Sequence, residues 1–195
     1  QHTTATPLLI THGWPGSVLE YLDILDALTD PTQHGGSPED AFHVVLPALP
    51  GFGFSGKPRD TGTDVSKIAT LWETLMSRLN YSQFHAHGGD WGSIVTQAIL
   101  LQEKTGCTAG HCTLPIVLPD DTTLADPQPA ELDALESFQF YNDWDSGYSK
   151  QQSTRPQTLG YGLADSPSGQ MAWIVEKFAF WMDCQRNGIR HPENV

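Results

Sequence analysis

The first 118 residues alternate between two patterns of hydrophobic positions. Short apolar runs, typical of buried strands, occur at residues 7–11, 41–46, 82–86 and 108–118. Apolar positions spaced three and four apart predict helices that begin at Ser17, after Asp64 and at Ile94. Strands that alternate with helices predict an α/β fold, with a mostly parallel sheet and helices on both of its faces.

The helix that begins at Ser17 carries its own start signal. Ser17 with Glu20 three residues later forms a capping box, in which each side chain accepts a backbone N–H of the other residue. The apolar positions expected to face a core are Val18, Tyr21, Leu22, Leu25 and Leu28.

The alternation stops after Pro119. An acidic, proline-bearing linker is predicted at 120–131, followed by helices at 131–141 and 172–183 with no strand between them. We therefore expect a partial α/β core at 1–118 and a partial helical cap, or lid, at 119–195.

The most informative motif joins the third predicted strand to the helix at 94–104. Residues 87–93 read His-Gly-Gly-Asp-Trp-Gly-Ser, the pattern of a nucleophile elbow with aspartate as the nucleophile. A side chain on so tight a turn leaves no room for neighbouring Cβ atoms, so Gly88 and Gly92 are needed. Asp90 would attack a carbon electrophile with an oxygen that is already ionised, forming a covalent ester.

A structural role for Asp90 is the alternative. Aspartate is a good helix N-cap, and the Asp90 carboxylate could hold the first amides of the following helix. That hypothesis expects the side chain to turn back onto the helix.

A second motif, His-Gly-Trp-Pro-Gly at residues 12–16, follows the first predicted strand. An acyl-transfer site needs two backbone N–H groups that point at the oxygen that becomes negative. Trp91, directly after the nucleophile, and Trp14, in this loop, are the expected donors. His12 is expected to be structural and bonded to nearby loop carbonyls. The alternative is a plain turn with no catalytic task.

Together with the segments at 49–55, 147–163, 165–167 and 173–178, these motifs resemble the epoxide hydrolases of the α/β-hydrolase superfamily, and the microsomal-type branch most. The resemblance covers nearly all of the chain and implies a partial α/β-hydrolase fold, with its core at 1–118. It implies that Asp90 opens an epoxide, a small-molecule substrate, on the way to a vicinal diol. It also implies that Tyr148, rather than Tyr141 or Tyr161, donates a proton to the departing oxygen. No metal or organic cofactor is implied, and the activity would serve detoxification of xenobiotic epoxides.

The chain departs from the family pattern after the cap, where the second tyrosine, the acid and the general-base histidine are expected. His85, His87 and His111 lie in strands and are expected to pack or to bond to backbone, and His191 lies near the end without strand context. Asp120 is a weak candidate for the acid. We therefore expect a fragment, truncated at both ends, that cannot turn over by itself.

Composition limits the binding partners and the cellular compartment that we expect. The net charge of -13 argues against binding nucleic acid or an anionic membrane. Three cysteines fit buried thiols in a reducing compartment, and no apolar run reaches membrane-spanning length. A cytoplasmic protein is expected. An anchor ahead of residue 1 and the oligomeric state, a homodimer included, stay open.

Two other functions use the same residues. A haloalkane dehalogenase-like enzyme shares the aspartate elbow, and Trp91 could then donate to a leaving halide. A non-catalytic binding module would also account for the missing base. Diol formation and halide release would separate the first alternative from an epoxide hydrolase.

Overall fold

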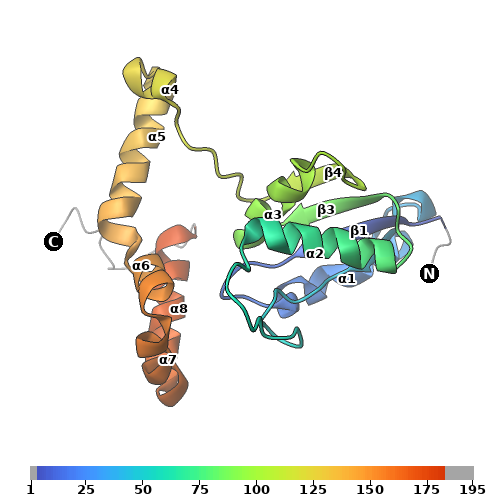
Figure 1. The fold of residues 1–195 in the computed structure, drawn as a ribbon, viewed down its shortest axis with the longest axis horizontal. Coiled ribbons are helices and arrows are strands. Elements are labelled where there is room, and N and C mark those ends of the chain that lie inside the picture. The colour runs from blue at the N-terminus through green and yellow to red at the C-terminus, as the bar shows by residue number, and fades with distance from the viewer. Residues whose placement is uncertain (1–3, 183–195) are drawn as a thin grey trace. The chain divides into compact units, whose positions relative to one another are not determined.

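The computed structural model describes residues 4–182. The chain divides into two compact units, residues 1–118 and 119–195, and each is described by itself. Figure 1 shows strands and helices in the first unit and helices in the second.

The first unit is built on one four-stranded sheet. Its strands are β1 (Thr6–Thr11), β2 (Phe42–Val45), β3 (Phe84–Gly88) and β4 (Cys107–Cys112). They lie in the order β2-β1-β3-β4, and each neighbouring pair is parallel. The predicted α/β class is confirmed, and β1 and β3, which lead into the two sequence motifs, are direct neighbours in the sheet.

Helical segments connect the strands. They are η1 (Val18–Tyr21), α1 (Leu22–Thr29), η2 (Pro31–His34), η3 (Pro38–Asp40), α2 (Val65–Arg78) and α3 (Trp91–Leu100). The capping box of Ser17 and Glu20 is present, although it opens a 3-10 turn before α1. The Asp64 carboxylate accepts the Lys67 amide at 2.9 Å and caps α2.

Several boundaries differ from prediction, and α3 begins at Trp91 rather than at Ile94. β3 begins at Phe84 rather than at residue 82. The strand predicted to reach Leu118 ends as β4 at Cys112. Cys112 pairs with Gly88, the last residue of β3, so β4 has no strand to pair with beyond it, and Pro115 lacks the backbone N–H that a longer ladder would need.

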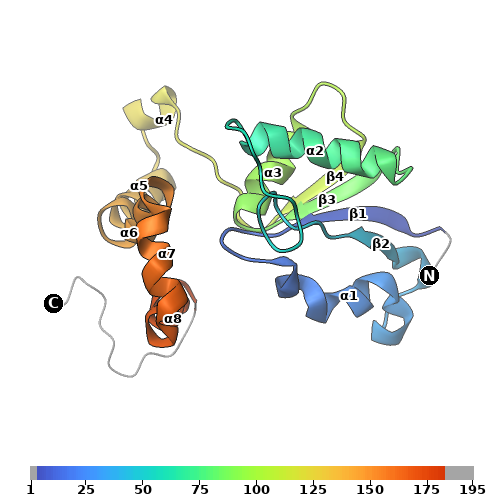
Figure 2. The same cartoon turned by 60° about the horizontal axis from the view of Figure 1, so that its bottom comes forward.

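The two faces of the sheet bear different cores. Figure 2 shows α2 and α3 over one face and α1 over the other. The larger core lies under α2 and α3 and includes Met76, Phe84 and Ile99, which are fully buried. The smaller core joins β1 to Tyr21 and partly buried residues such as Leu28. The prediction that Leu22 faces a core is wrong, because Leu22 is 51% exposed at the start of α1.

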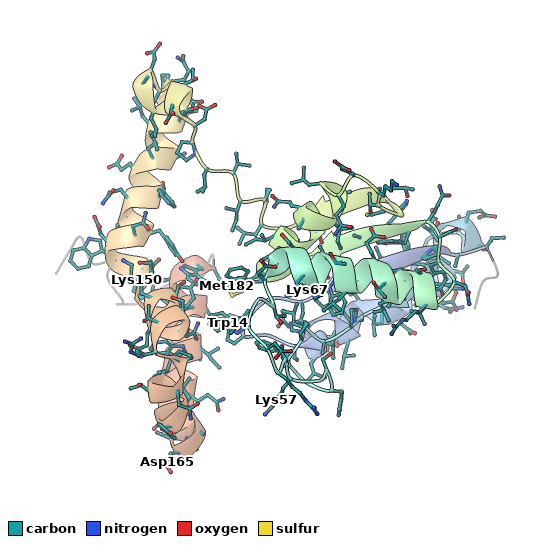
Figure 3. All side chains as sticks on the ribbon, viewed as in Figure 1. Trp14, Lys57, Lys67, Lys150, Asp165 and Met182 are labelled. Carbon is teal, nitrogen blue, oxygen red and sulfur yellow. The ribbon has the colours of Figure 1, made fainter. Side chains whose placement is uncertain are left out.

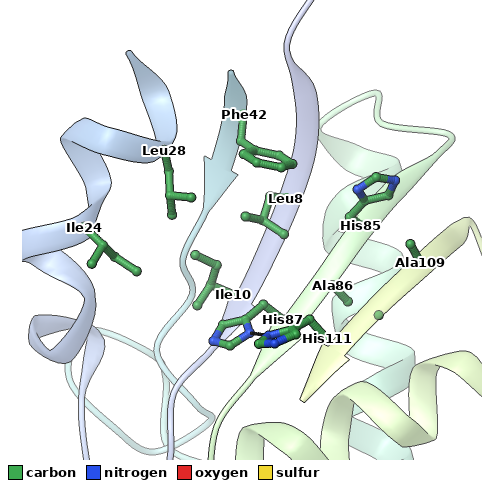
Figure 4. A pocket seen from close by; sticks show the side chains of 11 residues that line it. Leu8, Ile10, Ile24, Leu28, Phe42, His85, Ala86, His87, Ala109 and His111 are labelled. Carbon is green, nitrogen blue, oxygen red and sulfur yellow. Dashed lines mark hydrogen bonds between the residues drawn. The ribbon is translucent and has the colours of Figure 1, made fainter. Parts of the chain in front are cut away.

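A pocket of about 410 Å³ opens on the α1 side of the sheet. Figure 4 shows Ile24 and Leu28 of α1 at one end and Ala109 and His111 of β4 at the other. Within it, His87 and His111, paired in register on β3 and β4, are stacked and share a hydrogen bond of 2.8 Å between their Nδ1 atoms. The stacking is one of the two outcomes expected for these histidines, and the hydrogen bond between their side chains was not predicted.

The described part of the second unit is helical. Its elements are α4 (Asp121–Ala125), α5 (Pro129–Phe140), the π-helical turn η4 (Tyr141–Asp145), α6 (Gly147–Thr154), α7 (Pro156–Asp165) and α8 (Pro167–Trp181). The predicted linker contains α4, and the last helix begins at Pro167 rather than at residue 172. Ser166 caps it by accepting the Gly169 amide at 3.0 Å.

Cys107 and Cys112 are free thiols, and burial raises the pKa of each. Cys184 and His191 lie outside the described residues. Across residues 4–182, no helix combines the length and the apolar character needed to cross a bilayer.

A substitution at Met76 tests the placement of the larger core. Replacing Met76 by Ala removes a fully buried side chain, and we expect it to lower the free energy of unfolding by about 2–5 kcal/mol. Leu79→Ala, on the same helix end but 45% exposed, should cost less than about 1 kcal/mol. Urea denaturation of both variants measures the difference, and equal losses would show that the core is misplaced.

His87 should make the first unit sensitive to acid. Burial, followed by the charge of His111, lowers the pKa of His87 from its ordinary value of 6.5. The unfolded chain therefore takes up a proton at a higher pH than the folded chain does, so stability is lost as the pH falls below about 6.5.

His87→Gln should weaken this pH dependence, whereas the matched replacement of exposed His34 should not. Urea midpoints measured between about pH 7 and pH 5 provide the comparison. Identical slopes in the wild-type chain and His87→Gln would refute the assignment.

Candidate active site

The turn between β3 and α3 has the geometry of a nucleophile elbow. Asp90 stands between them with φ 52° and ψ -126°, a backbone conformation that is rare for a residue with a side chain. A Cβ atom on Gly88 would collide with the carbonyl group of Gly92, and one on Gly92 with the carbonyl oxygen of Thr11. The predicted need for glycine at both positions is confirmed.

The Asp90 side chain does not cap α3. It makes no capping hydrogen bond to that helix, so the structural alternative for Asp90 is wrong. Instead, Oδ1 of Asp90 accepts the backbone N–H of Trp14 at 2.8 Å. The residue is exposed, so the carboxylate is held at one oxygen and can be reached from solvent.

The loop that follows β1 comes very close to the elbow. A Cβ atom on Gly13 would lie 2.6 Å from the Cβ atom of Asp90, so only glycine fits there. Figure 3 labels Trp14 on this loop. The loop is closed on itself by the Gly16 amide, which donates to the Gly13 carbonyl at 3.0 Å.

His12 holds this loop in place through hydrogen bonds of its side chain. Its ring is fully buried, with Nδ1 2.6 Å from the carbonyl oxygen of Gly13 and Nε2 accepting the Leu49 amide at 3.0 Å. Because Nε2 accepts, the ring proton must be on Nδ1, which donates to Gly13. The predicted structural role of His12 is confirmed, and both ring nitrogens are engaged.

Trp91, the other predicted oxyanion donor, opens α3. The N–H groups in the first turn of a helix have no partner within it, which suits the Trp91 amide to binding a negative oxygen. Its side chain is 44% exposed.

Ser93 is a supporting residue that sequence reasoning missed. Its hydroxyl donates to the Gly88 carbonyl at 2.7 Å and accepts the Leu114 amide at 3.2 Å. This buried side chain ties the elbow to the segment that follows β4. The signal was present, because a small residue at this position is part of the elbow pattern, but its hydrogen bonds could not be inferred.

Tyr148 lies on α6 in the second unit and is half-buried. Its hydroxyl lies 3.2 Å from that of Tyr141, and its ring packs edge-on against Trp181 with centroids 5.2 Å apart. The third tyrosine considered, Tyr161 on α7, is 69% exposed. The structure therefore brings together two of the three phenols.

Asp120, the weak candidate for an acid, is an N-cap. Its carboxylate accepts the Thr123 amide at 2.8 Å, and this hydrogen bond lowers the pKa of Asp120. A metal site is not assembled either, since residues 4–182 contain no cluster of three or more histidine, cysteine or acidic side chains suited to one.

The chain is similar in sequence and fold to known proteins. A family model described as the alpha/beta hydrolase fold matches residues 6–157. A putative epoxide hydrolase from Stigmatella aurantiaca is 52% identical over 94% of this chain, and epoxide hydrolase 1 of the pig, Sus scrofa, is 37% identical over 91%. The chain spans 42% of the length of each of these two relatives.

A solved structure with a similar fold is also that of an epoxide hydrolase. Juvenile hormone epoxide hydrolase from the silkworm Bombyx mori superimposes with a TM-score of 0.78 at 30% identity, over 94% of this chain and 46% of that one. Since the family model spans most of the sequence, the chain belongs to the α/β-hydrolase fold family, and its homologues include epoxide hydrolases.

Proposed function

We propose that this chain is the nucleophile-bearing part of an epoxide hydrolase, which opens an epoxide through an ester on Asp90. The observation that carries the proposal is the hydrogen bond from the Trp14 amide to Asp90 Oδ1. It holds one carboxylate oxygen and leaves the other, Oδ2, to attack. The names of the relatives support an epoxide as the electrophile.

The first step forms a bond from Oδ2 of Asp90 to a ring carbon of the epoxide and breaks the bond from that carbon to the ring oxygen. The ring oxygen takes a proton and becomes a hydroxyl group, and the resemblance to epoxide hydrolases assigns the role of donor to the Tyr148 phenol. Aspartate is already ionised at neutral pH, so this nucleophile needs no base to activate it. A phenol suits the donor role because it is neutral at pH 7 yet acidic enough to protonate an alkoxide.

The second step is attack by water on the ester carbonyl. If Oδ2 carries the alkyl group, Oδ1 is the carbonyl oxygen and becomes the oxyanion. The Trp14 amide already contacts Oδ1, and the Trp91 amide at the start of α3 is the second donor. Donors in place before charge develops require no rearrangement during the reaction, which is the source of such stabilisation.

The water in that step needs a general base. His12 is engaged at both ring nitrogens, and His87 and His111 are bonded to each other. We therefore expect none of these three to activate water at Asp90, so the ester should accumulate in the 195-residue chain instead of being hydrolysed.

The ester can be tested directly. Incubation of the folded chain with styrene oxide should add one molecule of the epoxide, detected by intact mass and located at Asp90 by peptide mapping. Asp90→Asn should abolish the adduct, since a neutral amide is a poor nucleophile. Asp120→Asn, which makes the same change at a carboxylate that caps a helix, should form it normally.

A folded wild-type chain without an adduct, or an adduct that persists in Asp90→Asn, would overturn the proposal. Continuous release of diol would show that a base within these residues has been overlooked.

Tyr148 can be tested as the proton donor by comparing two electrophiles. Tyr148→Phe should slow alkylation of Asp90 by styrene oxide about 100-fold, because the departing oxygen loses its acid. Alkylation by benzyl bromide should change little, since bromide leaves without a proton. The rates can be followed by mass spectrometry, with Tyr161→Phe as the matched control.

If Tyr148→Phe slows neither reagent, Tyr148 is not the donor. Reaction of the wild-type chain with the halide and none with styrene oxide would instead favour the dehalogenase alternative, in which the Trp91 indole contacts the leaving halide.

A further inference from the structure

A lysine stands beside Tyr148 in the second unit. The Lys177 ammonium lies 5.2 Å from the centre of the Tyr148 ring and 5.3 Å from that of Trp181. Distances below about 6 Å place a cation within reach of the negative face of an aromatic ring. The Lys177 ammonium therefore interacts with both rings, which also pack edge-on against each other.

The ammonium is fixed in that position by Asp145. Lys177 Nζ lies 3.3 Å from both the Asp145 carbonyl oxygen and Oδ1, while Oδ2 of Asp145 accepts the Trp181 indole N–H at 3.1 Å. Nζ also lies 3.2 Å from the Glu176 carboxylate. The Lys177 and Asp145 side chains are only 15% and 16% exposed, so water screens their charges less than it would on the surface.

The simpler interpretation is that this ion pair only ties α8 to the turn before α6. Isolated ion pairs contribute little to stability, however, and an ammonium that is mostly removed from water carries a desolvation cost. The placement over the Tyr148 ring suggests a second effect, which acts on the chemistry of the phenol.

We propose that Lys177, held by Asp145, is a positioning residue that primes Tyr148 to give up its proton. Its role in ring opening rests on the proposed function. When the proton passes from the Tyr148 hydroxyl to the epoxide oxygen, negative charge develops on the phenol, and a nearby cation stabilises that charge. The Tyr141 hydroxyl, 3.2 Å away, can donate a hydrogen bond to the same oxygen.

The effect of the Lys177 charge on the Tyr148 phenol can be tested without catalytic turnover. Tetranitromethane nitrates tyrosine rings through their ionised form, so its rate at Tyr148 reports how readily the phenol loses its proton. In the 195-residue chain, Lys177→Met should slow nitration of Tyr148 about threefold to tenfold relative to exposed Tyr161. Lys177→Arg, which keeps a cation at the ring, should restore the rate.

Lys150→Met is the matched control. Lys150 lies on α6, and its ammonium donates to the Asn142 carbonyl at 2.9 Å, so its loss should leave nitration of Tyr148 unchanged. A purely structural lysine gives the opposite sign, since its removal opens the ring to the reagent. Equal or faster nitration in Lys177→Met therefore overturns the proposal.

A second variant tests the proposal if Lys177→Met does not fold. If circular dichroism shows that Lys177→Met is unfolded, Lys177→Gln, which also removes the positive charge but keeps a polar side chain, should slow nitration in the same direction; equal or faster nitration there is likewise contradictory. The Asp90 adduct is measured in the same samples. If nitration does not follow the expected pattern but Asp90 is still alkylated, only the proposed role of Lys177 is refuted. If nitration follows the expected pattern but no adduct forms, only the proposed function is refuted.

Discussion

The candidate site depends on a close backbone approach between two neighbouring parallel strands. β1 and β3 pair directly, and the turns that follow them meet where the Trp14 amide donates to Oδ1 of Asp90. This contact exists only because Gly13 and Gly92 lack Cβ atoms, which would overlap Asp90 and the Thr11 carbonyl, respectively. The strained backbone of Asp90 is the local consequence, and it keeps the carboxylate away from the helix that it would otherwise cap.

The surrounding structure maintains that approach. His12 bonds to the loop of Trp14 on one side and to the loop after β2 on the other, while Ser93 ties the elbow to the segment after β4. The core under α2 and α3 fixes β3 from beneath. Such support matters because an electrostatic site works through donors that are already in place when charge develops.

Sequence reasoning located the parts of the molecule that follow from local rules. The strand positions, the caps at Ser17 and Asp64 and the glycines of the elbow are dictated by spacing and by backbone sterics, and the structure has them. Exposed Leu22 shows the limit of periodicity, which identifies an apolar stripe but not whether a neighbouring element covers it.

Two of the misses have a non-local cause and one has a local cause. The His87–His111 hydrogen bond depends on the register between β3 and β4, which no short pattern specifies. The helices α6 and α7 were unpredicted because residues 147–165 are rich in glycine and polar side chains and show little helical periodicity. The Lys177–Asp145 pair joins residues 32 positions apart and likewise required the fold.

The most direct test of the central claim is a crystal structure of the chain after reaction with an epoxide. The account predicts continuous electron density from Oδ2 of Asp90 to a carbon of the opened ring, with Oδ1 still within hydrogen-bonding distance of the Trp14 amide. Density for the adduct on any other side chain, or on an Asp90 that has turned back to cap α3, would contradict it.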